Sequence, residues 1–160
     1  MATTVLSLTL SVSPSHSYAN TNFNQEVMCL AQNIYFESRG EPIKGQIAVA
    51  LVTLNRVNHP DFPKTVCGVV QQSMKNNKGQ PIRGKCQFSW YCDGKSDVLP
   101  SGSEQVKQSV ALAVVLLTTP VKVDITNGAL FFHASYVKPS WRKSSEKTIA
   151  IGNHIFYRRS

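Results

Sequence analysis

An amphipathic helix that ends in a glycine and a proline is the feature of this sequence that most constrains its fold. Apolar residues at helical spacing predict one buried face: Val27, Leu30, Ala31 and Ile34. Glu37 follows at the same spacing, so we expect its carboxyl group at the margin of the core, where Gly40 and Pro42 stop the helix. Lost hydration raises the pKa of such a carboxyl group, as a general acid near neutral pH requires. A solvated helix end with an Arg39–Glu41 ion pair is the alternative that this local pattern leaves open.

Three further helices are predicted downstream. The first spans about residues 43–57, with an apolar face made of Ile47, Ala50, Leu51 and Leu54. Asp61 is a candidate N-cap for a short helix, whose core residues are Val66, Val69 and Val70. A capping box of Ser101 and Glu104 starts the last helix, whose second half is nearly apolar. We therefore expect this last helix to be central and buried.

The remaining segments predict a loop and short strands. Residues 75–85 are polar and predict a loop, whereas aromatic and polar residues alternate over 86–94 and predict a short strand or hairpin. Three strands are predicted near the C-terminus, over 129–133, 148–151 and 154–157. The last two are joined by Gly152-Asn153, a two-residue pair that is typical of hairpin turns. Helices followed by a small antiparallel sheet predict an α+β fold in a single domain.

The chain of 160 residues is long enough for one domain with its own core, which we assign to residues 23–160. Residues 1–22 contain a short apolar run and small residues around Ser17-Tyr18-Ala19, and we expect them to be a signal peptide or a flexible tail. No lysine or arginine precedes that run. Neither this run nor the apolar run over 110–117 is long enough to cross a bilayer, so no membrane span is expected.

The formal net charge of +8 favours an anionic partner. Cell-wall polymer, an outer-membrane surface and nucleic acid all meet this condition. The sequence contains no arginine-rich tract and no nucleic-acid-binding motif. Nucleic acid is therefore not the expected partner.

The four cysteines are Cys29, Cys67, Cys86 and Cys92. Cys29 lies in the first helix and is expected to be a buried thiol. Cys86 and Cys92 bracket a short segment and could be bridged, as could Cys67 with either of them. The sequence does not determine the pairing. Zinc ligation is less expected, because no paired C-x-x-C spacing is present.

The nine acidic residues are few enough to consider each as a catalytic group. Glu37 and Glu41 are the best candidates, because several of the others suit helix first turns, caps and loops. Gly40 turns Glu41 away, so we expect one principal acid and one supporting carboxylate instead of the opposed pair of most glycosidases. No H-E-x-x-H motif is present, and a zinc amidase built from distant residues stays open as an alternative. His133 follows a predicted strand and is either a hydrogen-bonded core residue or a cleft residue.

Aromatic side chains in polar segments can stack on sugar rings, and this sequence has four candidates: Trp90, Tyr91, Tyr136 and Trp141. Core packing is the alternative for each of them. If residues 86–90 form a plain strand, Gln87 and Ser89 share one face and line a cleft, while Phe88 belongs to the core. Trp90 then reaches the cleft only if the strand ends or twists before it.

Several motifs follow one another in one order between residues 26 and 158: YFESRGEP (35–42), GQIAVA (45–50), LNRV (54–57), TVCGVV (65–70), CQFSW (86–90), GALFFH (128–133), PSW (139–141) and GNHIFY (152–157). This series resembles the SleB-type cell-wall hydrolase family. The family comprises spore-cortex lytic enzymes, related bacterial hydrolases and some phage endolysins. The usual Glu-Ala-Arg-Gly-Glu motif reads Glu-Ser-Arg-Gly-Glu here, over residues 37–41.

The resemblance implies a mainly helical, lysozyme-like α+β domain that acts on the glycan strands of peptidoglycan. It also implies one essential glutamate, at the position that Glu37 matches. The spore enzymes often carry a separate peptidoglycan-binding domain, which these 160 residues do not include. A phage endolysin or a small exported hydrolase is the expectation that follows.

The mechanism that we expect is that of a lytic transglycosylase, in which Glu37 is the catalytic residue and the products carry 1,6-anhydro ends. Substrate contacts are expected from Glu41 and from five residues farther along the chain: Gln87, Ser89, Trp90, His133 and Trp141. No metal and no cofactor is needed for this chemistry. A hydrolytic muramidase that uses the same glutamate, an N-acetylmuramoyl-L-alanine amidase and a non-catalytic basic wall-binding module remain alternatives.

The expected partners are peptidoglycan strands and an anionic cell-wall or outer-membrane surface, with the protein acting as a monomer. The expected location is the periplasm or cell wall after export, or the host cell during phage lysis.

Overall fold

The computed structural model describes residues 15–160, and the side chains from residue 22 onward. Its elements follow one another as α1 (Ser15–Ser38), α2 (Ile43–Asn58), α3 (Val66–Val70), β1 (Ser73–Lys75), β2 (Pro81–Cys86), the 3-10 helix η1 (Ser89–Cys92), α4 (Glu104–Thr118), β3 (Phe131–Ala134), the 3-10 helix η2 (Ser140–Ser144), β4 (Ser145–Ile151) and β5 (His154–Arg159). The predicted α+β fold with a small antiparallel sheet is confirmed. The first 14 residues of the predicted signal peptide or tail lie outside the described part of the chain. No helix within residues 15–160 is long and apolar enough to cross a membrane.

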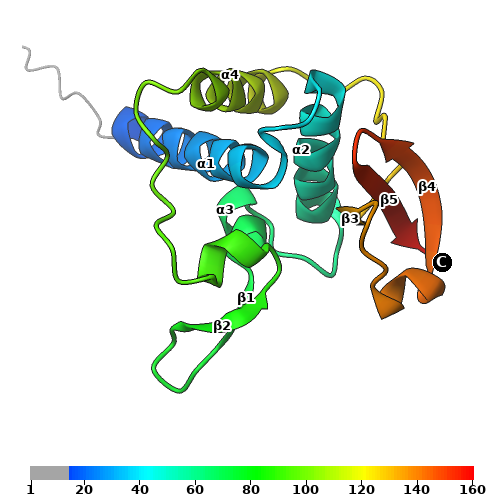
Figure 1. Ribbon diagram of the computed structural model, residues 1–160. Coiled ribbons are helices and arrows are strands. Elements are labelled where there is room, and N and C mark those ends of the chain that lie inside the picture. The colour runs from blue at the N-terminus through cyan, green and yellow to red at the C-terminus, as the bar shows by residue number, and fades with distance from the viewer. Residues whose placement is uncertain (1–14) are drawn as a thin grey trace, which may run out of the picture.

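The central helix of the fold is α2. It lies between α1 on one side and the C-terminal sheet on the other (Figure 1). Its middle is a continuous apolar run, and successive residues of that run are buried: Ala48, Val49, Ala50, Leu51 and Val52. Because both sides of α2 are covered, the run has no solvent-facing position.

The prediction that the last helix would be central and buried is wrong. α4 lies against α1 at the surface of the molecule (Figure 1), and its buried residues are Ser109 and Ala113. Val114 and Val115 are 38% and 54% exposed, although both belong to the nearly apolar half of the helix. Apolar content alone therefore does not decide burial, because α4 has a neighbour on only one face.

Two apolar clusters make up the core. The larger one joins α1, α2, α3 and α4 around Leu30, Ile34 and Val69. The smaller one joins α2 to the sheet around Val49 and Phe156. Burial of each such side chain stabilises the fold by about 1.5–3 kcal/mol.

The C-terminal sheet has the strand order β3-β5-β4, and both pairs are antiparallel. β4 and β5 are joined by the predicted Gly152-Asn153 turn, with Ile151 paired to His154. Gly152 adopts a φ of 56°, a left-handed conformation that favours glycine in such turns. The predicted hairpin is therefore confirmed.

The region between α3 and α4 differs from its prediction in two places. The expected loop over 75–85 is instead the β1–β2 hairpin, and the expected strand over 86–94 is the end of β2 followed by η1. Both strands of this hairpin are almost wholly exposed, so their side chains carry no alternating apolar signal. Gly79 and Gly84, with φ of 74° and 70°, allow the chain to turn and to bulge there.

Two disulfide bonds connect the four cysteines. Cys86–Cys92 was one of the bridges that the sequence left open, and it ties the end of β2 to η1. Cys29–Cys67 ties α1 to α3, so the prediction that Cys29 is a simple buried thiol is wrong. The two cysteines are 38 residues apart in the sequence, and no local pattern indicated that they form a bridge.

Two predicted helix caps are also corrected. Thr65, and not Asp61, caps α3, because its side-chain oxygen accepts from the backbone N–H of Gly68. Ser103, and not Ser101, precedes α4.

Candidate active site

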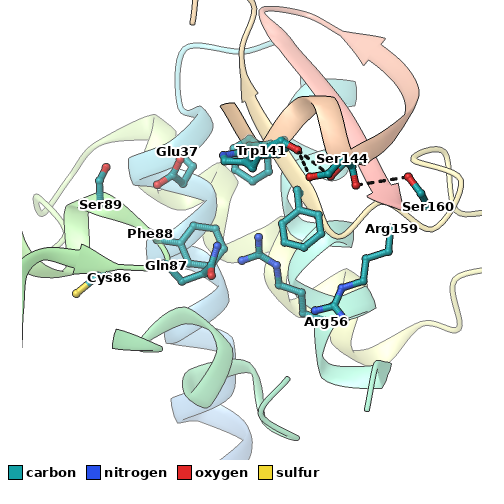
Figure 2. A pocket seen from close by; sticks show the side chains of 13 residues that line it. Glu37, Arg56, Cys86, Gln87, Phe88, Ser89, Trp141, Ser144, Arg159 and Ser160 are labelled. Atoms are coloured by element: carbon teal, nitrogen blue, oxygen red, sulfur yellow. Dashed lines mark hydrogen bonds between the residues drawn. The ribbon is translucent and has the colours of Figure 1, made fainter. Parts of the chain in front are cut away.

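A cleft of about 720 Å³ separates a helical wall from a C-terminal wall (Figure 2). The helical wall consists of Glu37 from α1, Arg56 from α2 and residues 86–89. The C-terminal wall consists of Trp141, Ser144, Ser145, Arg159 and Ser160. Phe131 and Phe132 of β3 also line the cleft. Glu37 is the one acidic residue that lines this cleft within the described part of the chain.

Glu37 is partly buried at the end of α1, where the sequence predicted it. Its carboxyl group forms no hydrogen bond and no ion pair with any residue from 22 to 160. Burial raises its pKa from 4.5 to about 7, although the nearby Arg56 opposes the shift. A substantial fraction of this carboxyl group is therefore protonated at neutral pH, and it can donate a proton into the cleft.

A buried hydrogen-bond chain fixes the helix turn that carries Glu37. Asn33, one turn earlier on α1, donates to the Thr53 hydroxyl of α2 at 3.0 Å. Its side-chain oxygen accepts from the indole N–H of Trp90 at 3.1 Å. Phe36 stacks on the same indole, with 4.8 Å between ring centroids. α1, α2 and η1 are thus joined directly below Glu37.

Arg56 is the cationic group of the helical wall. It is only 2% exposed, and its Nε donates to the carbonyl of Leu130 at 2.7 Å. Its guanidinium lies 5.0–5.7 Å from the ring centroids of Phe62, Phe88 and Phe131. Burial lowers its pKa to about 10, so Arg56 stays charged at neutral pH.

Arg56 was not among the site residues predicted from the sequence, although it lies within one of the family motifs. One local signal was present. Arg56 continues the buried face of α2 at helical spacing from Val49 and Val52, and a charge at such a position needs a partner. The adjacent Asn55 binds the segment before β3, donating to Asp124 and to the carbonyl of Ala129. The end of α2 therefore holds both the cleft cation and the start of the sheet.

The segment after β2 places its predicted residues differently from a plain strand. Gln87 and Ser89 are exposed and line the cleft as expected, and Phe88 is buried beside Arg56. Trp90 is only 8% exposed and does not line the cleft, so its expected place in the cleft wall is corrected. The chain enters η1 at Ser89, and this turn directs the indole inward to Asn33.

Trp141 supplies the exposed aromatic face of the C-terminal wall. It lies in η2, is 37% exposed and lines the cleft. Its ring packs edge-on against His133 and Tyr157, at 5.7 and 5.5 Å between centroids. His133 lies behind it and does not line the cleft. Its Nδ1 is 2.9 Å from the carbonyl of Ala134, which can only accept, so Nε2 accepts from the Tyr157 hydroxyl at 3.0 Å.

Glu41 lies outside the cleft and binds the β4–β5 turn. Its two carboxylate oxygens accept from the backbone N–H of Asn153 at 2.9 Å and from the Asn153 side chain at 3.1 Å. A Cβ atom at Gly152 would lie 2.0 Å from Oε2 of Glu41, so only glycine fits this approach. The contact joins the end of α1 to the sheet and thereby connects the two sides of the cleft.

Among residues 22–160, whose side chains the structure describes, no group of three or more histidine, cysteine or acidic residues could hold a metal ion. The amidase alternative therefore lacks a candidate ligand set in this part of the chain.

The chain is similar to known proteins in sequence and in fold. The cell wall hydrolase family matches residues 40–157. The spore cortex-lytic enzyme of Bacillus subtilis (strain 168) is 53% identical over 134 residues, which cover 83% of this chain and 37% of the relative. The corresponding enzyme of Oceanobacillus iheyensis is 43% identical over 144 residues, which cover 89% of this chain and 45% of the relative. The chain thus spans less than half the length of these curated relatives.

Two solved structures share the fold. The catalytic domain of the Bacillus cereus SleB protein is 31% identical, with a TM-score of 0.59, and the match covers 84% of this chain and 91% of that one. The catalytic domain of the germination-specific lytic transglycosylase SleB from Bacillus anthracis is 30% identical with the same TM-score, over 83% of this chain and 93% of that one. By sequence and by fold, this chain belongs to the cell wall hydrolase family.

Proposed function

We propose that this domain degrades peptidoglycan by cleaving the bond between N-acetylmuramic acid and N-acetylglucosamine, with Glu37 as the catalytic acid. The observation that carries the proposal is a single carboxyl group with a raised pKa in an open cleft. The relatives named above, a spore cortex-lytic enzyme and a lytic transglycosylase, support the same substrate.

One acid is sufficient if the sugar supplies its own nucleophile. Protonated Glu37 donates its proton to the glycosidic oxygen as the bond from the anomeric carbon to that oxygen breaks. The transition state has oxocarbenium character. The Glu37 carboxylate then takes the proton of the muramyl 6-hydroxyl, whose oxygen bonds to the anomeric carbon. The product has a 1,6-anhydro end, and Glu37 is protonated again.

The absence of a second acidic side chain from the described lining of the cleft supports this route. Glycosidases that use two carboxyl groups hold them about 5–9.5 Å apart on either side of the bond. Here the other charged side chains in the described lining of the cleft are Arg56 and Arg159, both cationic. Arg56 stabilises the carboxylate form of Glu37 that exists between the two proton transfers, since opposite charges attract strongly in a partly dehydrated site.

Gln87, Ser89 and Trp141 are the sugar contacts in this proposal. Trp141 offers an aromatic face for stacking from one wall, and Gln87 and Ser89 offer hydrogen bonds from the other. Glu41, His133 and Trp90 act indirectly, because each of them supports an element that lines the cleft. We further propose that the protein acts outside the cytoplasm, where its net charge of +8 favours association with anionic wall polymer.

The products of digestion test the proposal. Purified peptidoglycan is digested, and the soluble fragments are separated and weighed by mass spectrometry. Anhydro ends are expected, lighter by one water than the ends that a hydrolase leaves. Water-added ends would instead assign a muramidase that uses Glu37, and released peptides would assign an amidase. Binding without any fragment, by a folded protein, would assign a wall-binding module.

A further inference from the structure

The β1–β2 hairpin carries a concentration of positive charge beside the cleft. It contains Lys75, Lys78, Arg83 and Lys85, and no acidic residue occurs between residues 73 and 86. All four side chains belong to exposed residues. None of them forms an ion pair with another residue in the described part of the chain. The hairpin therefore presents four cations that the fold itself does not use.

This hairpin also contributes little to the core. Its two strands form a sheet of their own and project from the helical body (Figure 1). Met74 is 62% exposed on the same surface. Isolated two-stranded hairpins are marginal in water, and here the Cys86–Cys92 disulfide anchors the base of the hairpin to η1. A projecting element that is anchored at its base and carries apolar and cationic side chains is suited to contact a ligand.

A second groove connects the hairpin to the cleft. It has a volume of about 330 Å³ and is lined by Gln72, Ser73, Met74, Lys85, Cys86 and Gln87. Cys86 and Gln87 line the catalytic cleft as well, so the groove and the cleft are neighbours that share these two residues. A ligand group attached to a sugar in the cleft therefore has this groove beside it.

We propose that this groove is a subsite for the stem peptide of peptidoglycan, with Lys85 bound to a peptide carboxylate. The proposal rests on the function proposed above, because the stem peptide is attached to the muramyl sugar on which Glu37 acts. The lining matches such a peptide: one cation for a carboxylate, one thioether for a methyl side chain, and amide groups for the peptide backbone. A polyphosphate would favour a lining of several cations without an apolar side chain. The other three cations of the hairpin attract the acidic peptide at longer range.

Lys85→Gln tests the subsite, and Lys122→Gln is the matched control. Both changes remove one exposed lysine, but Lys122 follows α4 and lines neither the cleft nor the groove. Each protein is assayed on intact peptidoglycan and on the same glycan after enzymatic removal of its peptides. We expect Lys85→Gln to raise KM about three- to fivefold on intact peptidoglycan, as for one exposed ion pair, with kcat unchanged. On the peptide-free glycan it should equal the wild type, and Lys122→Gln should equal the wild type on both.

An equal rise in KM on both glycans would overturn the peptide assignment, and so would no rise on either. If the rise in KM depends on phosphate-containing wall polymer in the sample, and not on the peptide, the groove binds that polymer instead.

Titration with a free stem peptide separates this inference from the function on which it rests. Backbone amide NMR signals over residues 72–87 should shift in the wild type and in Lys122→Gln, but much less in Lys85→Gln. If no signal in this segment shifts in the wild type, the subsite is wrong even for an active enzyme. If the peptide binds there while no glycan is cleaved, the proposed reaction is wrong and the subsite stands.

Discussion

The two walls of the cleft are held in place by different kinds of interaction. The helical wall depends on buried contacts, namely the chain from Trp90 through Asn33 to Thr53 and the enclosure of Arg56 by aromatic rings. The C-terminal wall depends on aromatic packing of Trp141 against His133 and Tyr157 and on polar contacts that are more exposed. Its η2 segment is held by the Ser144 hydroxyl, which donates to the carbonyl of Trp141 at 2.9 Å, and its last strand by an ion pair between Arg159 and Asp61.

This difference matches two different requirements of catalysis. In the proposed reaction, proton transfer from Glu37 requires a position that is fixed within a fraction of an ångström, and buried hydrogen bonds supply that order. The sugar stacking proposed for Trp141 tolerates more movement, because a sugar ring can slide over an aromatic face with little loss of contact. We therefore expect substitutions in the helical wall to affect turnover or stability, and substitutions in the C-terminal wall to affect KM.

The largest expected effect is on turnover, for Glu37→Gln. The amide keeps the size of the side chain but cannot donate the proton, so kcat should fall about a hundredfold or more. Glu104→Gln is the control, because Glu104 is exposed on α4 and pairs only with Lys107 within the described residues. Release of soluble fragments from labelled peptidoglycan gives the rates, and circular dichroism verifies the fold. Wild-type turnover by a folded Glu37→Gln protein would falsify the catalytic assignment.

The same substitution should change how stability depends on pH. The pKa of Glu37 is about 7 in the folded protein and 4.5 when unperturbed, so the folded state binds the proton more tightly. The stabilisation is complete below pH 4.5 and is lost as the pH rises through 7. The wild type should therefore lose on the order of 2 kcal/mol relative to Glu37→Gln between these values, allowing for the partial exposure of the group. Urea unfolding of both proteins at pH 4 and pH 8 measures the difference. A constant difference would mean that Glu37 titrates normally.

Gly152→Ala should weaken the contact that joins the two sides of the cleft. The new Cβ would collide with the Glu41 carboxylate, and alanine is strained at a φ of 56°. Unfolding free energy should fall by about 2 kcal/mol. Gly128→Ala is the control for strain alone, because Gly128 has a φ of 76° but no atom within 4 Å of an added Cβ. Equal losses in the two variants would mean that the Glu41–Asn153 contact adds nothing.

Substitutions of the two tryptophans, one from each side of this comparison, test the roles of the two walls directly. Trp141→Ala should raise KM about tenfold, the loss of one aromatic stacking contact, with kcat nearly unchanged. Trp90→Phe keeps an aromatic ring but removes the donor to Asn33, so unfolding free energy should fall by about 1–3 kcal/mol with KM unchanged. Steady-state kinetics and thermal unfolding on both variants distinguish these results. If Trp90→Phe changes KM more than Trp141→Ala does, the roles of the two walls are reversed.

The sequence predicted those elements whose residue pattern lies within the element itself. The apolar spacing before Glu37, the run in α2 and the Gly152-Asn153 turn each contain their own signal, and all three elements formed as predicted. The burial of α4 was mispredicted, because burial depends on which neighbours a helix meets and not on its own residues. Cys29–Cys67 was missed for the same reason, since its partners meet only after α1 and α3 have packed together.

Site residues could be predicted where the residue type and the local pattern together indicated a chemical role. A carboxyl group at a helix end pointed to Glu37, and the alternation of side chains over residues 86–90 pointed to Gln87 and Ser89. Arg56 and Trp90 were not predictable in this way. Arg56 faces the cleft because three aromatic rings from distant segments enclose it, and Trp90 turns inward because the chain enters a 3-10 helix one residue earlier.

The smallest expected effect concerns the ion pair of the C-terminal wall. Asp61→Asn removes the partner of Arg159, whose side chain lines the cleft. The pair is exposed, so unfolding free energy should change by less than about 1 kcal/mol. The freed guanidinium can then bind an anionic group of the substrate, and KM should fall slightly at low salt and return to the wild-type value at high salt. Glu146→Gln is the control, because it frees Arg158, which does not line the cleft. A KM change of the same size in both variants would show that only net charge matters, and that Arg159 has no special place in the C-terminal wall.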